Sequence, residues 1–378
     1  MKATVSKTVI PVNYRNRGFE SRPLRQLSAI GLLSEVKMDK VNIILVGFGR
    51  VGRAFFELLK EKYDDCLQRY DLQLELRAIA RQKGIVLLSS TQKVLSPSYF
   101  AQDDLDNLAD WIKAITISDL LEEFRTGVLV DCTPSNLMSG EPGLSLARLA
   151  LDKGWHLATA SKGALVLRPD ELKELAEEKG LTIKASAAAA AALPTLDVGK
   201  RSLAGAEILA IEGILNGTSN YILTRMTEGL DFEAALKEAQ EKGIAEPEPS
   251  LDIDGWDTAA KMVIIANQVL DTEIKLSEVL VRGIRGLKKE IVEKASSLNK
   301  ILKLFGKCYR EKAYGPWKIE VGLALLDPVH PLAMTNGTNK GIIFYTDTMG
   351  WVAVTGGQSN PKGAAAALLK DIISIYRP

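Results

Sequence analysis

Val41 to Gly52 read VNIILVGFGRVG, and this stretch decides the fold of the chain. Residues 41–46 form a short continuous apolar run, which is typical of a strand buried on both faces. Gly47, Gly49 and Gly52 follow it with GxGxxG spacing, and a helical segment is expected at 54–63. In this context the three glycines permit a tight turn, a close approach of the backbone to a pyrophosphate and close helix–strand packing. The stretch therefore predicts a dinucleotide-binding loop that includes Phe48 and Val51, although coincidental glycines in a plain turn are the alternative.

The pattern after this loop alternates between strands and helices. Further strands are expected at 74–80, 128–131, 156–159 and 181–185, and helices at 143–153 and 170–179. Such alternation predicts a parallel sheet with right-handed crossovers. Residues 41–185 therefore form a doubly wound nucleotide-binding unit in this interpretation.

The order of the expected strands and helices changes after residue 185. An alanine run at 187–192 predicts a close-packed junction between two domains. Beyond it, the following elements are expected: strands at 208–215, 318–325, 341–345 and 350–354, and helices at 219–227, 231–242, 256–269 and 362–376. The predicted fold class is α/β, with a Rossmann-type doubly wound parallel sheet and an α+β catalytic and dimerisation domain. The predicted boundaries are 39–185 with 355–378 for the first domain and 186–354 for the second.

Composition and charge narrow the classes of function. The chain has 378 residues, of which 46% are hydrophobic and 25% charged, so it can bury a sizeable core. Its net charge of +1 gives no indication of nucleic acid or a membrane as a partner. Three widely spaced cysteines form no disulfide framework, which favours a cytoplasmic location. Two histidines are too few for a His-rich metal site.

The first 37 residues differ from the rest of the chain. They carry seven basic and two acidic residues, and no helical or strand period runs through them. We expect residues 1–38 to be a disordered extension or the product of a start codon placed upstream of Met38. An Arg-rich targeting peptide is the alternative, but it would need an amphipathic helix that the pattern does not contain.

The end of the second predicted strand indicates which cofactor is bound. Domains that bind NAD usually place Asp or Glu there to accept a hydrogen bond from the ribose 2′-hydroxyl. This strand ends at Arg81, and Lys83 follows two residues later. A guanidinium can form a charge-assisted fork with a 2′-phosphate. NADP(H) is therefore the preferred cofactor, NAD(H) is possible, and a solvated basic loop is the alternative.

Asp257 and Lys261 lie four residues apart on a predicted helix, so they share one face. Acidic residues precede them on a proline-containing loop. Taken alone, this spacing is also typical of a surface ion pair on a solvated helix. The order of the surrounding motifs decides between the two interpretations.

Seven segments of this chain resemble homoserine dehydrogenase, in the order that this family shows. They are 131–136 (DCTPSN), 140–143 (GEPG), 159–165 (TASKGAL), 216–222 (NGTSNYI), 243–257 (GIAEPEPSLDIDGWD) continuing to Lys261, 330–333 (HPLA) and 336–338 (NGT). The likeness spans roughly residues 41–378. It implies an NADP-dependent enzyme that interconverts L-homoserine and L-aspartate 4-semialdehyde in threonine and methionine biosynthesis. It also implies a homodimer and a C-terminal helix that returns to the nucleotide domain.

The resemblance implies a role for each residue of the site. Lys261 donates the proton to the aldehyde oxygen during reduction, Lys162 stands close to the reacting centre and shares this task, and Asp257 orients the lysine or the substrate. The residues expected to bind the substrate are Glu246 and Asp252 at its ammonium, with Thr218 and the Gly217 backbone. The residues expected to touch the cofactor, besides the glycine loop and Arg81, are Thr133, Ser161, Lys162 and Gly243.

Two positions depart from the family pattern. Ser161 stands where an Asn usually precedes the active lysine. Ser186 stands where a Glu usually helps to hold a monovalent cation, and the backbone carbonyls that complete that site fall at Ala189, Ala191 and Leu193. A hydroxyl cannot replace the charge of a carboxylate, so we expect the ion to be absent or weakly bound, and no other metal is expected.

Two alternative functions stay open at this stage. One is a dehydrogenase of a related amino-acid aldehyde or alcohol, which the departures at Ser161 and Ser186 would allow. The other is a non-catalytic NADP(H)-binding sensor, but the presence of both Lys162 and Lys261 argues against it, since a sensor needs no proton transfer.

Overall fold

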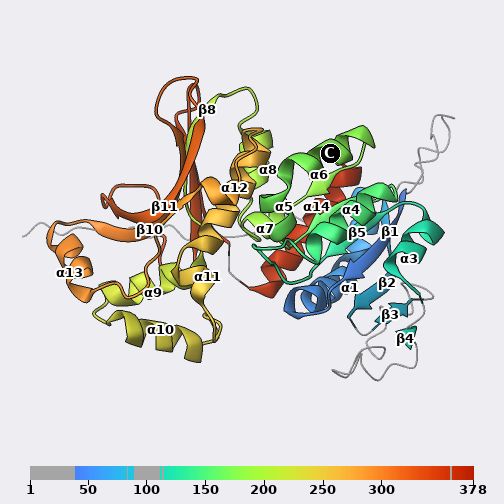
Figure 1. The fold of residues 1–378 in the computed structure, drawn as a ribbon, viewed down its shortest axis with the longest axis horizontal. Coiled ribbons are helices and arrows are strands. Elements are labelled where there is room, and N and C mark those ends of the chain that lie inside the picture. The colour runs from blue at the N-terminus through green and yellow to red at the C-terminus, as the bar shows by residue number, and fades with distance from the viewer. Residues whose placement is uncertain (1–38, 83, 89–110, 113–114, 358–359) are drawn as a thin grey trace, which may run out of the picture. The chain divides into compact units, whose positions relative to one another are not determined.

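The computed structural model describes residues 39–82, 84–88, 111–112, 115–357 and 360–378. The expected N-terminal extension and Lys83 lie outside the described residues. The described part contains two sheets, which Figure 1 shows with the helices around them.

The first sheet carries the glycine loop. Its strands lie in the order β4-β3-β2-β1-β5-β6-β7. Their bounds are β1 Asp39–Val46, β2 Leu72–Arg81, β3 Gly84–Leu87, β4 Trp111–Ile112, β5 Val128–Asp131, β6 His156–Thr159 and β7 Ile183–Lys184. The five strands from β2 to β7 in this order are parallel, whereas β3 and β4 are antiparallel. The predicted parallel sheet is therefore confirmed. The sequence did not predict its antiparallel edge of β3 and β4, which forms because β3 begins three residues after Arg81 instead of crossing over.

The alternation of side chains along β1 explains why helices cover both faces. Val41, Ile43 and Leu45 pack on one side with α1 and α14, and Ile44 and Val46 pack on the other. The helices of this half are α1 Arg50–Tyr70, α3 Ile117–Phe124, α4 Gly143–Asp152, α5 Gly163–Leu167 and α6 Pro169–Glu178. The C-terminal helix α14, Pro361–Tyr376, lies beside α1 (Figure 1) and thus returns to the first sheet.

A short linker leads from β7 to the second sheet. Its elements are α7 Ser186–Ala189, α8 Thr195–Asp197 and a π-helical turn at Val198–Ser202. The second sheet has the order β13-β12-β8-β10-β11-β9. Its strands are β8 Ile208–Ile214, β9 Leu280–Val281, β10 Ile301–Arg310, β11 Trp317–Leu326, β12 Lys340–Thr346 and β13 Trp351–Gly356.

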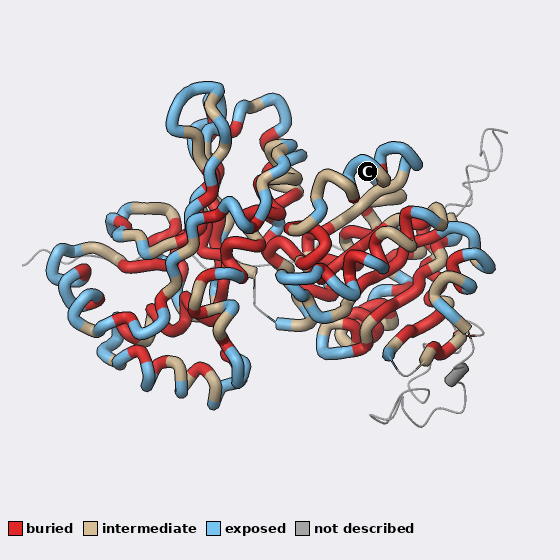
Figure 2. Tube along the Cα trace, viewed as in Figure 1, coloured by how far each residue is buried: buried red, intermediate tan, exposed pale blue. Residues whose placement is uncertain are grey.

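Helices cover one face of the second sheet. They are α9 Gly217–Thr227, α10 Phe232–Glu241, α11 Ser250–Ile253, α12 Trp256–Val269 and α13 Lys289–Ser297, with a 3-10 turn at Leu276–Glu278. Of these, α12 packs on β8, β10 and β11, and α9 and α13 pack on β10. Figure 2 shows buried residues along the strands and the inward sides of the helices, with exposed residues on the outer turns. None of the helices in the described part is long and apolar enough to cross a membrane.

Candidate active site

The glycine loop has the geometry that a bound pyrophosphate requires. Gly47 has a φ of +90°, and a Cβ atom there would lie 2.6 Å from the carbonyl carbon of Cys132. A Cβ atom on Gly52 would lie 2.1 Å from the carbonyl oxygen of Gly47, so only glycine fits. Around Gly49, by contrast, nothing described lies within 4 Å of such an atom. The loop is therefore closed on its protein side and open at Gly49, where a ligand could approach the backbone.

The start of α1 adds positive potential at the same place. Gly49 is its N-cap and no side chain caps the helix, so the first amide groups are available to an anion. Phe48 is buried, with its ring packed edge-on against Phe56, so a cofactor could contact it mainly through its backbone. Val51 is half-buried within the first turn of α1.

Arg81 is the last residue of β2 and lies at the carboxyl edge of the sheet. Together with Gln82 and Thr116 it lines a shallow hollow beside the turn to β3. The strand end thus presents a guanidinium and no carboxylate, as the sequence predicts. It lies apart from Lys162 and Lys261, which belong to the start of α5 and to α12.

The buried carboxylate of Asp131 connects the ends of β5 and β6 through hydrogen bonds. Its Oδ1 accepts hydrogen bonds from the backbone amide (2.9 Å) and the hydroxyl (2.6 Å) of Thr133, and its Oδ2 accepts one from Thr159 (2.9 Å). Burial raises the pKa of Asp131, and these bonds oppose that rise. The Ser161 side chain is also buried, and its hydroxyl has no hydrogen-bond partner among the described residues. This carboxylate therefore shapes the turn on which Thr133 lies.

Lysines from both halves of the structure meet at one carboxylate, that of Asp257. Lys261 donates to Asp257 Oδ2 at 2.6 Å, and both residues lie on α12. Lys162, at the start of α5, places its Nζ 3.4 Å from Asp257 Oδ1. Burial disfavours the charge of Asp257, but the two ammonium groups outweigh burial and hold the pKa of Asp257 well below its usual range. Asp257 therefore stays ionised and holds the two lysines together.

Further hydrogen bonds fix the positions of the two lysines. The Lys261 ammonium also donates to the Leu215 carbonyl at 2.9 Å, just after β8. The backbone amide of Lys162 donates to the Ser135 hydroxyl at 2.9 Å. An ammonium has three donors, so Lys261 keeps one for a substrate atom.

Asn216 connects Asp257 to a second carboxylate. Its Nδ2 donates to Asp257 Oδ2 (2.8 Å) and to Asp252 Oδ1 (2.6 Å), while its Oδ1 caps α9 by accepting from the Ser219 amide (2.8 Å). Burial raises the pKa of Asp252, and the charge of Asp257 raises it further. Asp252 is thus a carboxylate whose ionised form a nearby cation would stabilise.

A cavity of about 490 Å³ joins the glycine loop to this cluster. Its wall includes residues from both halves: Arg50, Ser135, Lys162, Gly243, Glu246, Asp252, Asp257 and Asn360. Glu246 pairs with Arg50 across it, and both side chains are largely exposed. Gly217 and Thr218 lie next to the cavity at the start of α9, where the Thr218 hydroxyl donates to the Ile244 carbonyl (3.1 Å).

Most of the predicted site residues therefore lie close together around this cavity. Two groups lie elsewhere, namely Arg81 and the residues of the expected cation site. Arg81 lies at another strand end, and Ser186 lies in the linker. Sequence reasoning missed Asn216 as a site residue, although it opens the segment NGTSNYI. An amide followed by a helix is usually interpreted only as a cap, which Asn216 also is. It also missed Arg50, Ser135 and the Leu215 carbonyl, because their roles depend on contacts distant in sequence.

Comparisons with known proteins identify the family to which this chain belongs. The family model described as homoserine dehydrogenase, NAD binding domain, matches residues 47–185, and the model described as homoserine dehydrogenase matches residues 194–373. A homoserine dehydrogenase from Methanocaldococcus jannaschii is 35% identical over 89% of this chain and 98% of its own length. The chain belongs to the homoserine dehydrogenase family.

Other homoserine dehydrogenases extend the likeness to different cofactors. An NAD(+)-dependent homoserine dehydrogenase of Pseudomonas canavaninivorans is 32% identical over 90% of this chain and 97% of its own length. The crystal structure of a putative homoserine dehydrogenase from Archaeoglobus fulgidus is 34% identical, covers 89% of this chain and 99% of its own, and superposes with a TM-score of 0.77. A hyperthermophilic archaeal homoserine dehydrogenase in complex with NADPH is 26% identical over 89% and 98%, with a TM-score of 0.73.

The linker does not fit the monovalent cation that the resemblance to homoserine dehydrogenase suggested. The Ser186 hydroxyl donates to Asp371 (2.7 Å) and accepts from Lys370 (2.7 Å), so it is already engaged. The carbonyl of Ala190, between Ala189 and Ala191, accepts from the Lys340 ammonium at 2.8 Å. The described residues also contain no cluster of three or more His, Cys, Asp or Glu that could hold a metal ion.

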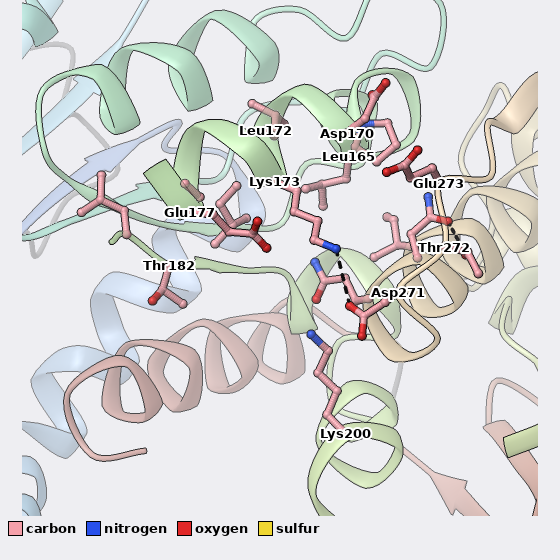
Figure 3. Close-up of a pocket in the computed structure, with 17 residues that line it drawn as sticks. Leu165, Asp170, Leu172, Lys173, Glu177, Thr182, Lys200, Asp271, Thr272 and Glu273 are labelled. Carbon is pink, nitrogen blue, oxygen red and sulfur yellow. Dashed lines mark hydrogen bonds and ion pairs between the residues drawn. The ribbon is translucent and has the colours of Figure 1, made fainter. Parts of the chain in front are cut away.

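A second cavity, of about 290 Å³, lies between α6 and the far end of α12. Figure 3 shows Lys173 pointing across it toward Asp271, with 3.8 Å between their charged atoms. Lys200 lies at its edge (Figure 3). None of the predicted catalytic or glycine-loop residues lines it, so it is separate from the candidate active site.

The open side of Gly49 and the closed side of Gly52 make a matched test. We expect Gly52→Ala to lower the melting temperature of the ligand-free enzyme, because the added methyl group overlaps the Gly47 carbonyl. Gly49→Ala should leave that temperature unchanged and raise the Kd of the dinucleotide, since the methyl group occupies the ligand's approach. Calorimetry of the free chain and fluorescence titration of the cofactor measure the two effects. Unchanged cofactor binding in Gly49→Ala would contradict the proposed position of the pyrophosphate.

Proposed function

We propose that this homoserine dehydrogenase prefers NADP and uses Lys261 as the proton donor to the aldehyde oxygen of aspartate semialdehyde. The observation that carries the catalytic part is the meeting of Lys162 and Lys261 on Asp257. Asp257 holds the two lysine side chains close together there, and Lys261 keeps one donor for the substrate. A bound nicotinamide supplies or accepts the hydride.

Lys261 is suited to proton transfer by its hydrogen bonds. Two of its three donors are fixed on Asp257 and Leu215, which leaves the third with a defined direction. When homoserine is oxidised, the same nitrogen, starting as the neutral amine, would receive the hydroxyl proton. Lys162 lines the cavity and would share in polarising the carbonyl oxygen, while Asp257 orients both ammonium groups.

Asp252 is suited to the amino end of the substrate. Its ionised form is disfavoured by burial and by Asp257, so an incoming ammonium group would relieve this penalty. Glu246 stands at the rim of the same cavity, where it would add a second negative charge once released from Arg50. Gly217 and Thr218 would supply further polar contacts, and Thr133, Ser161 and Gly243 would contact the cofactor.

The preference for NADP rests on Arg81. The strand end offers a guanidinium for a 2′-phosphate and no carboxylate for a free ribose hydroxyl. The relatives with NAD and with NADPH show that the fold accommodates either cofactor. A cytoplasmic location, expected from the cysteines, belongs to the proposal as well.

A homodimer is also proposed, through the face of the second sheet that the described helices leave uncovered. A groove crosses this face, lined by Phe305, Ala324 and Tyr345 together with Glu212 and Lys307. Trp351, which pairs with the groove residue Tyr345 on the edge strand β13, is more than half exposed. A second copy of the same sheet would cover this apolar area with a matching surface.

Lys261→Met tests the catalytic role. We expect turnover of homoserine, followed by nicotinamide absorbance, to fall by about 10²–10⁴-fold, the usual worth of a general acid. The Kd of the cofactor should stay unchanged. Lys237→Met, on the exposed side of α10, is the control and should retain full activity. No turnover of homoserine by the unmodified enzyme, or full turnover by Lys261→Met, would refute the proposed function.

Arg81→Ala tests the cofactor preference. A charge-assisted contact to a phosphate contributes roughly 1.5–3 kcal/mol, so the Kd for NADP should rise about ten- to a hundredfold. The Kd for NAD should barely change, and Arg81→Asp should reverse the preference. Arg69→Ala, at the far end of α1, serves as the control. If the ratio of the two Kd values is the same in Arg81→Ala and the control, the 2′-phosphate is not bound at this strand end.

Ala324→Arg tests the dimer. The unmodified enzyme should sediment as a dimer, and an arginine in the groove of the uncovered face should convert it to a monomer. Ala234→Arg is the matched control, because Ala234 is an exposed alanine on α10, on the other side of the sheet. Sedimentation velocity distinguishes the species. An unmodified monomer, or an Ala324→Arg dimer, would contradict this choice of interface.

A further inference from the structure

Lys340 is a buried lysine at the start of β12, beside the catalytic half of the molecule. Only 2% of the residue is exposed. Its ammonium donates to the Ala190 carbonyl at 2.8 Å, and this is the one hydrogen-bond acceptor that it has among the described residues. A buried charge is costly without partners, so its position calls for an explanation.

A second buried lysine, Lys303, shows what a purely structural ammonium looks like in the same sheet. Its Nζ has three acceptors: Asn220 Oδ1 (3.1 Å), the Thr335 carbonyl (2.6 Å) and Asn336 Oδ1 (2.9 Å). All three of its donors are therefore used, on α9 and on the loop that precedes β12. Lys340 differs because it has a single hydrogen bond, and that bond is made to the linker.

The linker to which Lys340 is bonded positions the catalytic helix. Ala190 follows α7, which packs against both α12 and α14. The next residue, Ala191, has a φ of +53°, a left-handed conformation that is unfavourable for alanine. Such a conformation persists only when its surroundings hold it. The ammonium of Lys340 holds the carbonyl immediately before the strained residue.

The charge of Lys340 also acts on the catalytic cluster. Burial lowers the pKa of Lys340 to about 7, with a smaller contribution from the charges of Lys261 and Lys162, while Asp257 opposes the shift. These are the charged groups that face it from α12 and from the start of α5. Below about pH 7, Lys340 is therefore a third cation near the ionised carboxylate that Lys162 and Lys261 share.

We propose that Lys340 is a positioning residue, a built-in cation that replaces a monovalent metal ion in the linker. Its ammonium binds the carbonyl of Ala190. This carbonyl lies within the segment in which the carbonyls of Ala189, Ala191 and Leu193 would otherwise bind such an ion. The Ser186 hydroxyl is already bonded to Lys370 and Asp371, so it does not bind a metal ion either. The linker and α12 are thereby fixed, and with them the meeting of Lys162 and Lys261 on Asp257. This inference rests on the proposed roles of the two lysines.

Cation rescue of Lys340→Ala tests the inference. The variant removes the ammonium and leaves space for a small cation beside the exposed carbonyl. Loss of a charge-assisted hydrogen bond should lower kcat about tenfold or more, with little change in the KM of the cofactor. Ammonium or methylammonium should restore kcat saturably and raise the melting temperature of the free chain, whereas choline at equal ionic strength should do neither. The unmodified enzyme should respond equally to all these salts.

Two further variants keep the outcome interpretable. Lys340→Met fills the space of the side chain, so it should be as impaired as Lys340→Ala but insensitive to added cations. Lys303→Ala also removes a buried ammonium, so it should lose stability without gaining a saturable response of kcat. Full activity of folded Lys340→Met would overturn the proposal. So would a saturable sodium or potassium requirement in the unmodified enzyme, or equal rescue of Lys303→Ala. Turnover by the unmodified enzyme in every salt separates these results from failure of the proposed function.

Discussion

The ionised carboxylate of Asp257 is the interaction on which the active site depends. It is almost fully buried, and it binds one lysine from its own helix and one from the other half of the structure. Removing a partner from a buried ion pair leaves an uncompensated charge, which is far more costly than the pair itself is stabilising. The two sheets are therefore held in one relative arrangement at the candidate active site.

The rest of the fold supports this carboxylate from several directions. Asn216 orders Asp257 and Asp252 with one amide, and Gly255, whose φ is +89°, starts α12 so that Asp257 lies in its first turn. The return of α14 to the first sheet packs it against α1 and the linker helix α7. Cofactor loop, linker and catalytic helix thus share neighbours, which explains how a contact in the linker can affect the lysines.

Much of this arrangement could be predicted from the sequence because its signals are local. The apolar run and glycines of 41–52 specify a strand, a turn and a helix, and the family motifs identify Lys162, Asp257 and Lys261. The strand β10 was missed because Lys303, Lys307 and Arg310 interrupt its apolar pattern, and only the fold shows that Lys303 is buried. The antiparallel edge after Arg81 and the pairing of Glu246 with Arg50 likewise depend on contacts that no local pattern encodes. No local sequence pattern indicated a role for Lys340, since its hydrogen-bond partner lies 150 residues away.

A double-mutant cycle between Lys162 and Asp257 tests the central claim most directly. The free energy of unfolding would be measured for the unmodified enzyme, Lys162→Met, Asp257→Asn and the double variant. If the carboxylate joins the two halves as described, the two substitutions should be coupled by about 1 kcal/mol or more, as residues in direct contact are. Effects that add to within about 0.5 kcal/mol, as independent sites do, would contradict it.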